Sequence, residues 1–405
     1  MNQTPGSQTA APPLGVSALV VLVAMMFTSQ MAITIFLPAL PALASDLGQT
    51  VDAARLIIPA YLGAFALAQL VVGPLSDAYG RRVVILAGLV VFGVASFACA
   101  LAPDIEILML ARFVQASGSC TLLVISRAMV RDTSHGAAAA RAMAYLGMAM
   151  GVGPAVGPFL GGILVEHTDW RATFFATAAI AAVVLVAGLA VLPETLPPAL
   201  RQPPRIATLA RNGARLFGLR AFMGYCLATG FAVAVFQAYL SGSPTVLITL
   251  GGITPEQFGF YILAAPICFI AANLFTARIV ARLGIDRLIW LGGIMLAGAP
   301  AALVLAALAG VDRPWVFIVV AGVFSVGSGL VVPTTLAGAM TAVAPSMAAS
   351  ASALAGFFQM AVSTVATLTV SAFIHTSSLP TATVMTVAGV STVAFFALLV
   401  KPWRR

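Results

Sequence analysis

The chain has 405 residues, of which 61% are hydrophobic and only 8% are charged. A soluble domain carries about a quarter charged residues because its surface faces water, so this composition excludes an ordinary soluble protein. The formal net charge of +8 could indicate a nucleic-acid partner. The basic residues, however, lie in short gaps between apolar runs, as the positive-inside rule of membrane proteins predicts, and we expect no nucleic-acid binding.

The apolar runs are about 20 residues long, enough to cross a bilayer as helices and too long for barrel strands. Helices also pair every backbone N–H and C=O within the lipid. We therefore predict an all-α membrane protein with twelve transmembrane helices in two pseudo-symmetric six-helix halves. The predicted spans are 14–37, 53–73, 83–102, 105–126, 138–164, 172–192, 219–240, 257–280, 287–309, 314–336, 347–374 and 380–400.

The longest polar segment follows the sixth span and divides the chain. We expect an N-terminal tail over 1–13, a six-helix half over 14–192, a central loop over 193–218, a second half over 219–400 and a tail over 401–405. The first apolar run is longer than a signal-peptide core and has no basic segment before it, so we interpret it as an uncleaved span. Arginines crowd the side that holds the central loop, which places this loop and both termini in the cytoplasm.

The polar loop after the second span has closely spaced glycines, an acid and two arginines. Its glycines allow a tight turn, and Asp77 can lie at a helix terminus or pair with a neighbouring arginine, for which Arg131 is the expected partner. The alternative is a solvated loop that only orients the protein. We interpret the set as a conformational latch. Its residues are Gly73, Asp77, Gly80, Arg81, Arg82 and Arg131. A similar stretch, 277–287, follows the eighth span and indicates an internal repeat.

Arg112 is the only charge that the predicted boundaries place well inside a span. A charge in the membrane interior costs several kcal/mol unless it meets a cavity or a partner, which makes a functional role the first hypothesis. Snorkelling to the outer interface is the alternative. The fifth span has small residues every four positions, a pattern that lets two helices approach closely. This packing set consists of Gly153, Gly157, Pro158, Gly161 and Gly162.

In transporters built from two repeats, the substrate cavity lies near the membrane midplane between the two halves, and we expect one here. Amide, aromatic and methionine side chains are the expected lining, a mixture that suits apolar compounds. For each of these residues, packing between helices or contact with lipid is the alternative. The candidates for substrate or proton binding are Arg112, Gln30, Thr34, Met31, Gln115, Tyr61, Gln237, Phe236 and Gln359. The four cysteines lie in apolar runs without metal-ligand spacing, and we expect neither a metal nor a cofactor.

Three of these segments resemble signatures of the major facilitator superfamily: the loop 73–82, the span-four segment 108–118 with Ala116 in place of a glycine, and the antiporter signature 153–162. Further segments resemble the bicyclomycin- and chloramphenicol-resistance (Bcr/CflA) branch of the twelve-span drug:proton antiporters. They are 34–41, 170–174, 193–198, 239–244 and 254–260. The resemblance implies a multidrug antiporter of the bacterial inner membrane that confers antibiotic resistance by proton-driven efflux. It also implies that spans one, four, seven and ten line the cavity. We expect the protein to act as a monomer.

The chain departs from this branch in span one, where Thr34 stands in place of the usual aspartate. Threonine does not titrate in a useful range, so the coupling site is open. Asp77, Asp132 and His375 are the remaining candidates. An uncoupled facilitator and a metabolite exporter of the same fold are alternatives to drug efflux. The spans lack paired acids or a nucleophile with a base, and we expect no enzymatic activity.

Overall fold

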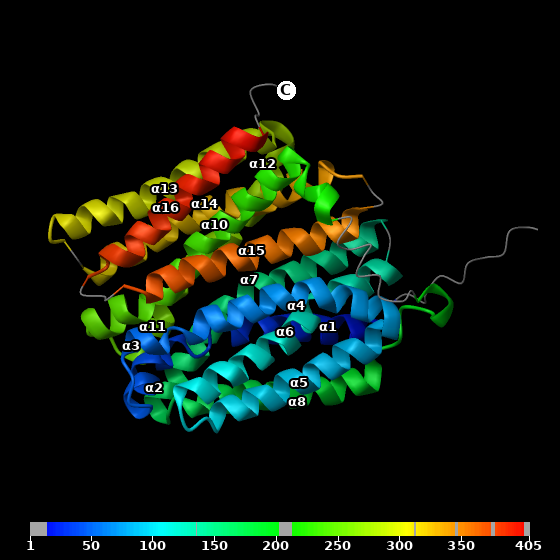
Figure 1. The fold of residues 1–405 in the computed structure, drawn as a ribbon, viewed down its shortest axis with the longest axis horizontal. Coiled ribbons are helices and arrows are strands. Elements are labelled where there is room, and N and C mark those ends of the chain that lie inside the picture. The colour runs from blue at the N-terminus through cyan, green and yellow to red at the C-terminus, as the bar shows by residue number, and fades with distance from the viewer. Residues whose placement is uncertain are drawn as a thin grey trace, which may run out of the picture.

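The computed structural model describes residues 14–134, 136–201, 213–311, 313–344, 347–373 and 377–400. Within these ranges the chain is helical, contains no strand and forms an elongated bundle (Figure 1). Twelve helical segments are long and apolar enough to cross a membrane, which confirms the predicted fold class. The two predicted tails, much of the central loop and His375 lie outside the described residues.

The helices of the N-terminal half occupy the lower part of Figure 1. They are α1 (Val16–Ala32), η1 (Leu37–Ala39), α2 (Leu40–Asp46), α3 (Val51–Ala54), α4 (Ile57–Tyr79), α5 (Arg81–Ala100), α6 (Ile105–Thr133), α7 (Gly136–His167) and α8 (Arg171–Val191), followed by the short η2 (Pro198–Leu200).

The C-terminal half repeats this order, and most of it lies in the upper part of the view, whereas α11 lies near α2 and α3 at the left. Its elements are α10 (Arg220–Pro244), the π-helical η3 (Thr245–Leu250), α11 (Pro255–Ile262), α12 (Ala264–Leu283), α13 (Ile285–Leu308), α14 (Pro314–Thr341), α15 (Ala348–Ser371), α16 (Leu379–Phe395) and the π-helical η5 (Phe396–Val400).

Three spans differ from the predicted ones in a way that affects the interior. The first regular helix ends at Ala32, and the chain turns before η1 and α2, where Pro38 and Pro41 cannot donate helical hydrogen bonds. The eighth span is divided at Leu263 into α11 and α12. The fourth span, α6, continues to Thr133 instead of ending near 126, and it therefore includes Arg127.

Matching contacts in the two halves confirm their pseudo-symmetry. Helix α5 packs on α6 and α8, and α13 packs in the same way on α14 and α16. A methyl group added at Gly118 would overlap the backbone of Gly88, and one added at Gly327 would overlap the backbone of Gly292. Each half thus has one glycine pair at which two helices touch through their backbones.

Two seams join the halves, and both are formed by helices. Helices α4 and α15 lie side by side along the middle of the bundle (Figure 1). Helix α7 contacts α11 near the end of the bundle that also holds α2 and α3. There the rings of Phe159 and Phe260 meet edge to face with their centroids 5.1 Å apart. We refer to this end as the α11 end.

Candidate functional site

The side chain of Arg112 lies inside the N-terminal half, only 1% exposed. Its guanidinium carbon is 4.3 Å from the ring centroid of Phe36 and 4.2 Å from that of Tyr61, with the Phe174 ring at 5.8 Å. A desolvated cation over aromatic faces gains about 2 kcal/mol or more. Phe36 lies between α1 and η1, Tyr61 on α4 and Phe174 on α8, so three separate segments build this aromatic box around one residue of α6.

A short chain of hydrogen bonds holds the same guanidinium. Arg112 Nη1 donates to the carbonyl oxygen of Ala32 (3.1 Å) and to Gln115 Oε1 (2.6 Å), and Gln115 Nε2 donates to Ser96 Oγ (2.7 Å). Ala32 is the last residue of α1, where carbonyl groups carry the negative end of the helix dipole. The guanidinium is thus enclosed by protein groups and does not extend to the surface of the bundle, whereas a snorkelling side chain would.

No carboxylate in the described part of the chain forms an ion pair with Arg112. The ion pairs among the described residues involve other arginines, and Arg112 Nε has no hydrogen-bond partner there. Gln115, predicted beside Arg112, is its direct hydrogen-bond acceptor, and Tyr61 is one wall of its box. The compensation of the charge therefore comes from one neutral amide, one helix carbonyl and aromatic faces.

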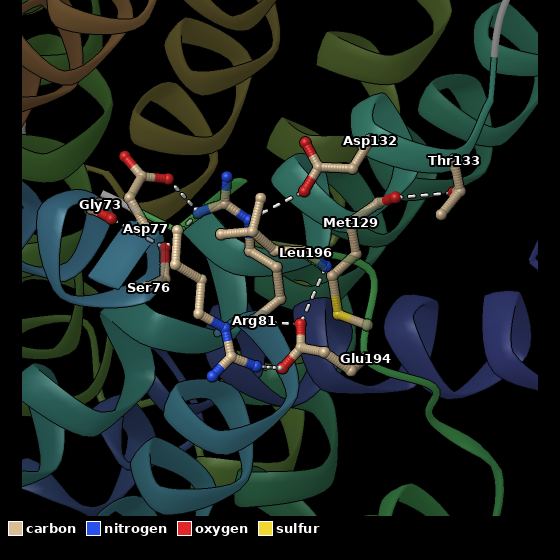
Figure 2. A network of polar contacts seen from close by, with 10 residues as sticks. Gly73, Ser76, Asp77, Arg81, Met129, Asp132, Thr133, Glu194 and Leu196 are labelled. Carbon is tan, nitrogen blue, oxygen red and sulfur yellow. Dashed lines mark hydrogen bonds and ion pairs between the residues drawn. The ribbon is translucent and has the colours of Figure 1, made fainter. Parts of the chain in front are cut away.

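The predicted latch is a network around Arg81, the first residue of α5 (Figure 2). Arg81 Nη1 lies 2.5 Å from Asp77 Oδ1 and donates to Ser76 Oγ at 2.5 Å, while Arg81 Nε lies 2.8 Å from Asp132 Oδ2. One guanidinium therefore connects the end of α4 with the end of α6. Gly80, with φ 100°, allows the sharp turn that presents Arg81 to both carboxylates.

The polar segment after α8 closes the network on its other side. Glu194 Oε1 accepts hydrogen bonds from the backbone N–H groups of Arg81 (2.9 Å) and Leu196 (3.0 Å), and Glu194 Oε2 lies 3.6 Å from Arg201 Nη2. A carboxylate at the first turn of α5 also satisfies the positive end of that helix dipole. The start of the central loop is thus bound to the turn between α4 and α5.

The position of Arg131 differs from the prediction. The arginine that pairs with Asp77 is Arg81, and the residue of α6 that joins the network is Asp132, whereas Arg131 is exposed. Helix α6 continues through both positions, and neighbouring helical residues point about 100° apart, so only one of the two can face α5. Of the remaining predicted latch residues, Arg82 donates to the Leu189 carbonyl (2.8 Å) and Gly73 accepts from Ser76 (2.8 Å).

The glycines of the fifth span bring α7 into backbone contact with α1. A Cβ at Gly153 would overlap Gln30, one at Gly157 would overlap the Thr34 hydroxyl, and one at Gly161 would overlap the Ile35 carbonyl oxygen. Gly162 faces the backbone of Pro255 and Glu256 on α11. Pro158 of α7 contacts Gly259, which also lies on α11. Helix α7 therefore packs against its own half and against the other half at once.

This packing also places three predicted lining residues. Thr34 and Met31 are fully buried and Gln30 is nearly so. The Thr34 hydroxyl donates to the Met31 carbonyl (3.3 Å), so the residue in place of the family's acid fills the contact between α1 and α7. In the C-terminal half, the Phe236 ring lies 6.3 Å from that of Phe324, Gln237 is nearly buried and Gln359 is half-buried. The described contacts do not join these three residues to Arg112.

Arg127 is the interior residue that the predicted spans missed. It is half-buried on α6, and its Nη2 contacts Met150 Sδ on α7. The apolar run ends before Arg127, and the signal that could have moved the boundary was the continued helical pattern of small and apolar residues up to Thr133. The structure also has an apolar crevice of about 420 Å³, between α4 and α15, which was not predicted. It is lined by Pro59, Ala60, Gly63, Ala64, Ala66, Leu67, Phe113, Phe357, Ala361 and Thr364.

The profile of the Major Facilitator Superfamily matches residues 22–367. The chain belongs to this superfamily. Multidrug resistance protein D of Escherichia coli is 30% identical over 85% of this chain and 86% of its own length. The bicyclomycin resistance protein homolog of Haemophilus influenzae is 24% identical over 64% of this chain and 65% of its own length. An uncharacterized MFS-type transporter of Bacillus subtilis is 37% identical, but the match spans 56% of this chain and 57% of that protein.

Solved structures support the same fold. A POT family transporter in complex with 5-aminolevulinic acid superimposes with a TM-score of 0.78 over 97% of this chain and 99% of that chain, at 14% identity. A D-xylose–proton symporter gives a TM-score of 0.77 over 95% of this chain and 97% of that chain, also at 14% identity. Family and fold are those of membrane transporters for small molecules. Within the described ranges, no group of three or more His, Cys, Asp or Glu side chains could hold a metal ion.

Proposed function

We propose that this protein is a multidrug efflux transporter of the bacterial inner membrane that exports small apolar organic compounds by alternating access. The observation that carries the proposal is the similarity to multidrug resistance protein D, which extends over 85% of the chain. The bicyclomycin resistance homolog and the multidrug transporter MdfA of Yersinia pestis, 29% identical over 68% of the chain, support the same function. The buried Arg112 also supports it, because a charge inside the spans of a membrane protein is typically functional.

Alternating access needs two rigid halves and seams that can part. The glycine pairs Gly88/Gly118 and Gly292/Gly327 supply tight packing within each half. The contacts between α4 and α15 and between α7 and α11 are the seams at which the halves would rock. The arginine-rich side, which includes the Arg81 network, is assigned to the cytoplasm by the positive-inside rule, so the α11 end is the outer end.

The proposal includes proton coupling, and it assigns the proton-binding site to a position outside span one. Thr34 cannot carry the proton, whereas Asp77 and Asp132 share the single cation of Arg81. Protonation of either carboxylate would remove one ion pair between α4, α5 and α6, and would thereby link proton binding to the conformation of the cytoplasmic end. A facilitator without coupling is the competing function, because the usual coupling acid is absent.

The test of both proposals is a susceptibility panel in a bacterial strain that lacks its own efflux pumps. Expression of the chain is expected to raise resistance to phenicols and bicyclomycin at least about fourfold and to lower their accumulation. An uncoupler is expected to abolish the difference in accumulation, because an antiporter cannot concentrate substrate without the proton gradient. Equal accumulation with and without the chain would contradict efflux, and efflux that survives the uncoupler would contradict proton coupling alone.

The network predicts that Asp77→Asn and Asp132→Asn each lower transport about tenfold while the protein still inserts. Each substitution removes one of the two carboxylates that hold Arg81. Because both act through the same guanidinium, the double variant is expected to lose less than the product of the single losses. Asp286→Asn, next to the corresponding Gly284 turn of the other half, is the control. Full efflux by well-expressed Asp77→Asn protein would refute the latch.

A further inference from the structure

The distribution of charge along the spans is one-sided. All twelve acidic residues lie outside the spans or within two residues of a span's end. Three arginines lie at least five residues from a span's end: Arg112 on α6 is seven residues from the first residue, Ile105, Arg127 on α6 is six residues from the last, Thr133, and Arg278 on α12 is five residues from Leu283. Arg278 is exposed, so of these three only the two arginines of α6 are at least partly buried. The interior of the spans therefore carries positive charge without a carboxylate at comparable depth.

The contacts of these two arginines are neutral. Arg112 is held by a carbonyl, an amide and aromatic rings, and the described contact of Arg127 is the Met150 sulfur. The helix dipole at the end of α1 offsets at most about half a charge at Arg112. With 3.6 residues per turn, the two side chains leave α6 about 60° apart and about 22 Å apart along the axis, so one face of the helix has a positive group at each depth.

Arg127 contacts α7, the helix of its own half that also packs on α12 of the other half. Its contact Met150 precedes Gly151 on α7, and a methyl group added at Gly151 would touch Ile270 of α12 in the other half. The Arg127 residue is half-buried, so its charge is only partly shielded by protein. The place where a rocking transporter holds its substrate is the boundary between the halves near the midplane. A solute bound beside α7 at this boundary would be attracted or repelled by the Arg127 charge, which has no ion pair among the described residues.

We infer that the substrates of this transporter are neutral or anionic organic compounds, such as weak acids, and that organic cations are disfavoured. The inference rests on the proposed efflux function and specifies the charge of its substrates. A tenfold preference corresponds to about 1.4 kcal/mol. Two unit charges 8 Å apart in a medium with a dielectric constant of about 20 interact by more than this, and the sign is opposite for cation and anion.

Two dyes with one ring skeleton provide the test: fluorescein methyl ester, an anion, and rhodamine 123, a cation of nearly the same shape. Their binding to the detergent-solubilised full-length protein is followed by fluorescence anisotropy, because this measurement involves no membrane potential. The anion is expected to bind at least about tenfold more tightly than the cation. The preference is expected to shrink as salt concentration rises, since salt screens partly exposed charges.

Arg127→Gln is expected to reduce the ratio of anion to cation affinity to about threefold or less. The matched control is Arg141→Gln, which removes an exposed arginine from α7 at the same end of the bundle and should leave the ratio unchanged. If Arg127→Gln does not yield monodisperse protein, the ratio for the unmodified chain and its salt dependence decide. Equal or tighter binding of rhodamine 123, or a ratio unaffected by Arg127→Gln, would overturn the inference.

Neutral chloramphenicol separates this inference from the function on which it rests. Energised transport of chloramphenicol in proteoliposomes, together with no preference for the anionic dye, would overturn the charge selectivity and leave efflux standing. Failure to transport chloramphenicol and both dyes would overturn the proposed function and the inference with it. Transport of chloramphenicol with preference for the anion is the expected result.

Discussion

Arg112→Met is expected to abolish transport, a loss of at least about a hundredfold in the initial rate. Methionine fills a similar volume but leaves Gln115 Oε1 and the Ala32 carbonyl without their shared donor, and the Phe36 and Tyr61 rings without their cation. Each buried polar group left without a partner costs about 1–3 kcal/mol. Initial rates in proteoliposomes, normalised to the amount of folded protein, measure the effect.

Two further variants separate charge from shape at Arg112. Arg112→Lys keeps the charge but loses the planar group that stacks between two rings, so we expect it to restore only a small part of the rate. Arg278→Met, which removes an exposed arginine from α12, is the control and should transport normally. Resistance in cells expressing Arg112→Met that equals that of the unmodified chain would reduce Arg112 to a structural residue.

Gly161→Ala is expected to lower both transport and thermal stability. The added methyl group would overlap the carbonyl oxygen of Ile35, and a backbone atom of α1 cannot move aside without separating α1 from α7. We expect a decrease of several degrees in Tm and a loss of about tenfold or more in transport rate. Detergent-based thermal unfolding and proteoliposome uptake measure the two effects separately.

Gly147→Ala on the same helix is the matched control, because no heavy atom lies within 4 Å of the added methyl group. Alanine favours a helix over glycine by about 0.5–1 kcal/mol, so this variant should be neutral or slightly stabilised. The two substitutions are chemically identical, yet Gly161→Ala is predicted to lower the Tm and Gly147→Ala to leave it unchanged or raise it slightly. Equal Tm values for both variants would mean that the contact between α7 and α1 does not limit stability.

The sequence predicted the fold because its signals are local and repeated. Span length, low charge and the glycine pattern of 153–162 each follow from what lipid and close helix packing require. The burial of Arg112 was also predictable, since its position in an apolar run leaves few alternatives. The contacts of Arg112 were only partly predictable. Gln115 lies one turn away on the same helix and could be foreseen, whereas Phe36 and Phe174 are distant in sequence and reach Arg112 only after the half has folded.

The end of α6 marks the limit of such predictions. Hydropathy alone ends the span before Arg127, because it cannot register that the helix continues into the polar edge of the bundle. The same error made Arg131 the expected partner of Asp77, since a loop residue could point in any direction. Once the helix is known to continue, its 3.6-residue period directs Asp132 toward Arg81 and leaves Arg131 exposed.

Beside the ring contact of Phe159 and Phe260, the seam at the α11 end includes direct backbone contacts: Gly162 meets Pro255, and Gly259 meets the Pro158 carbonyl. Amide hydrogens in such a contact exchange slowly with solvent. Local opening of the contact exposes these amide groups and speeds the exchange. Deuterium uptake in the segments 158–162 and 255–262 therefore reports separation of the seam directly. It does so without an attached probe, a mutation or knowledge of the substrate.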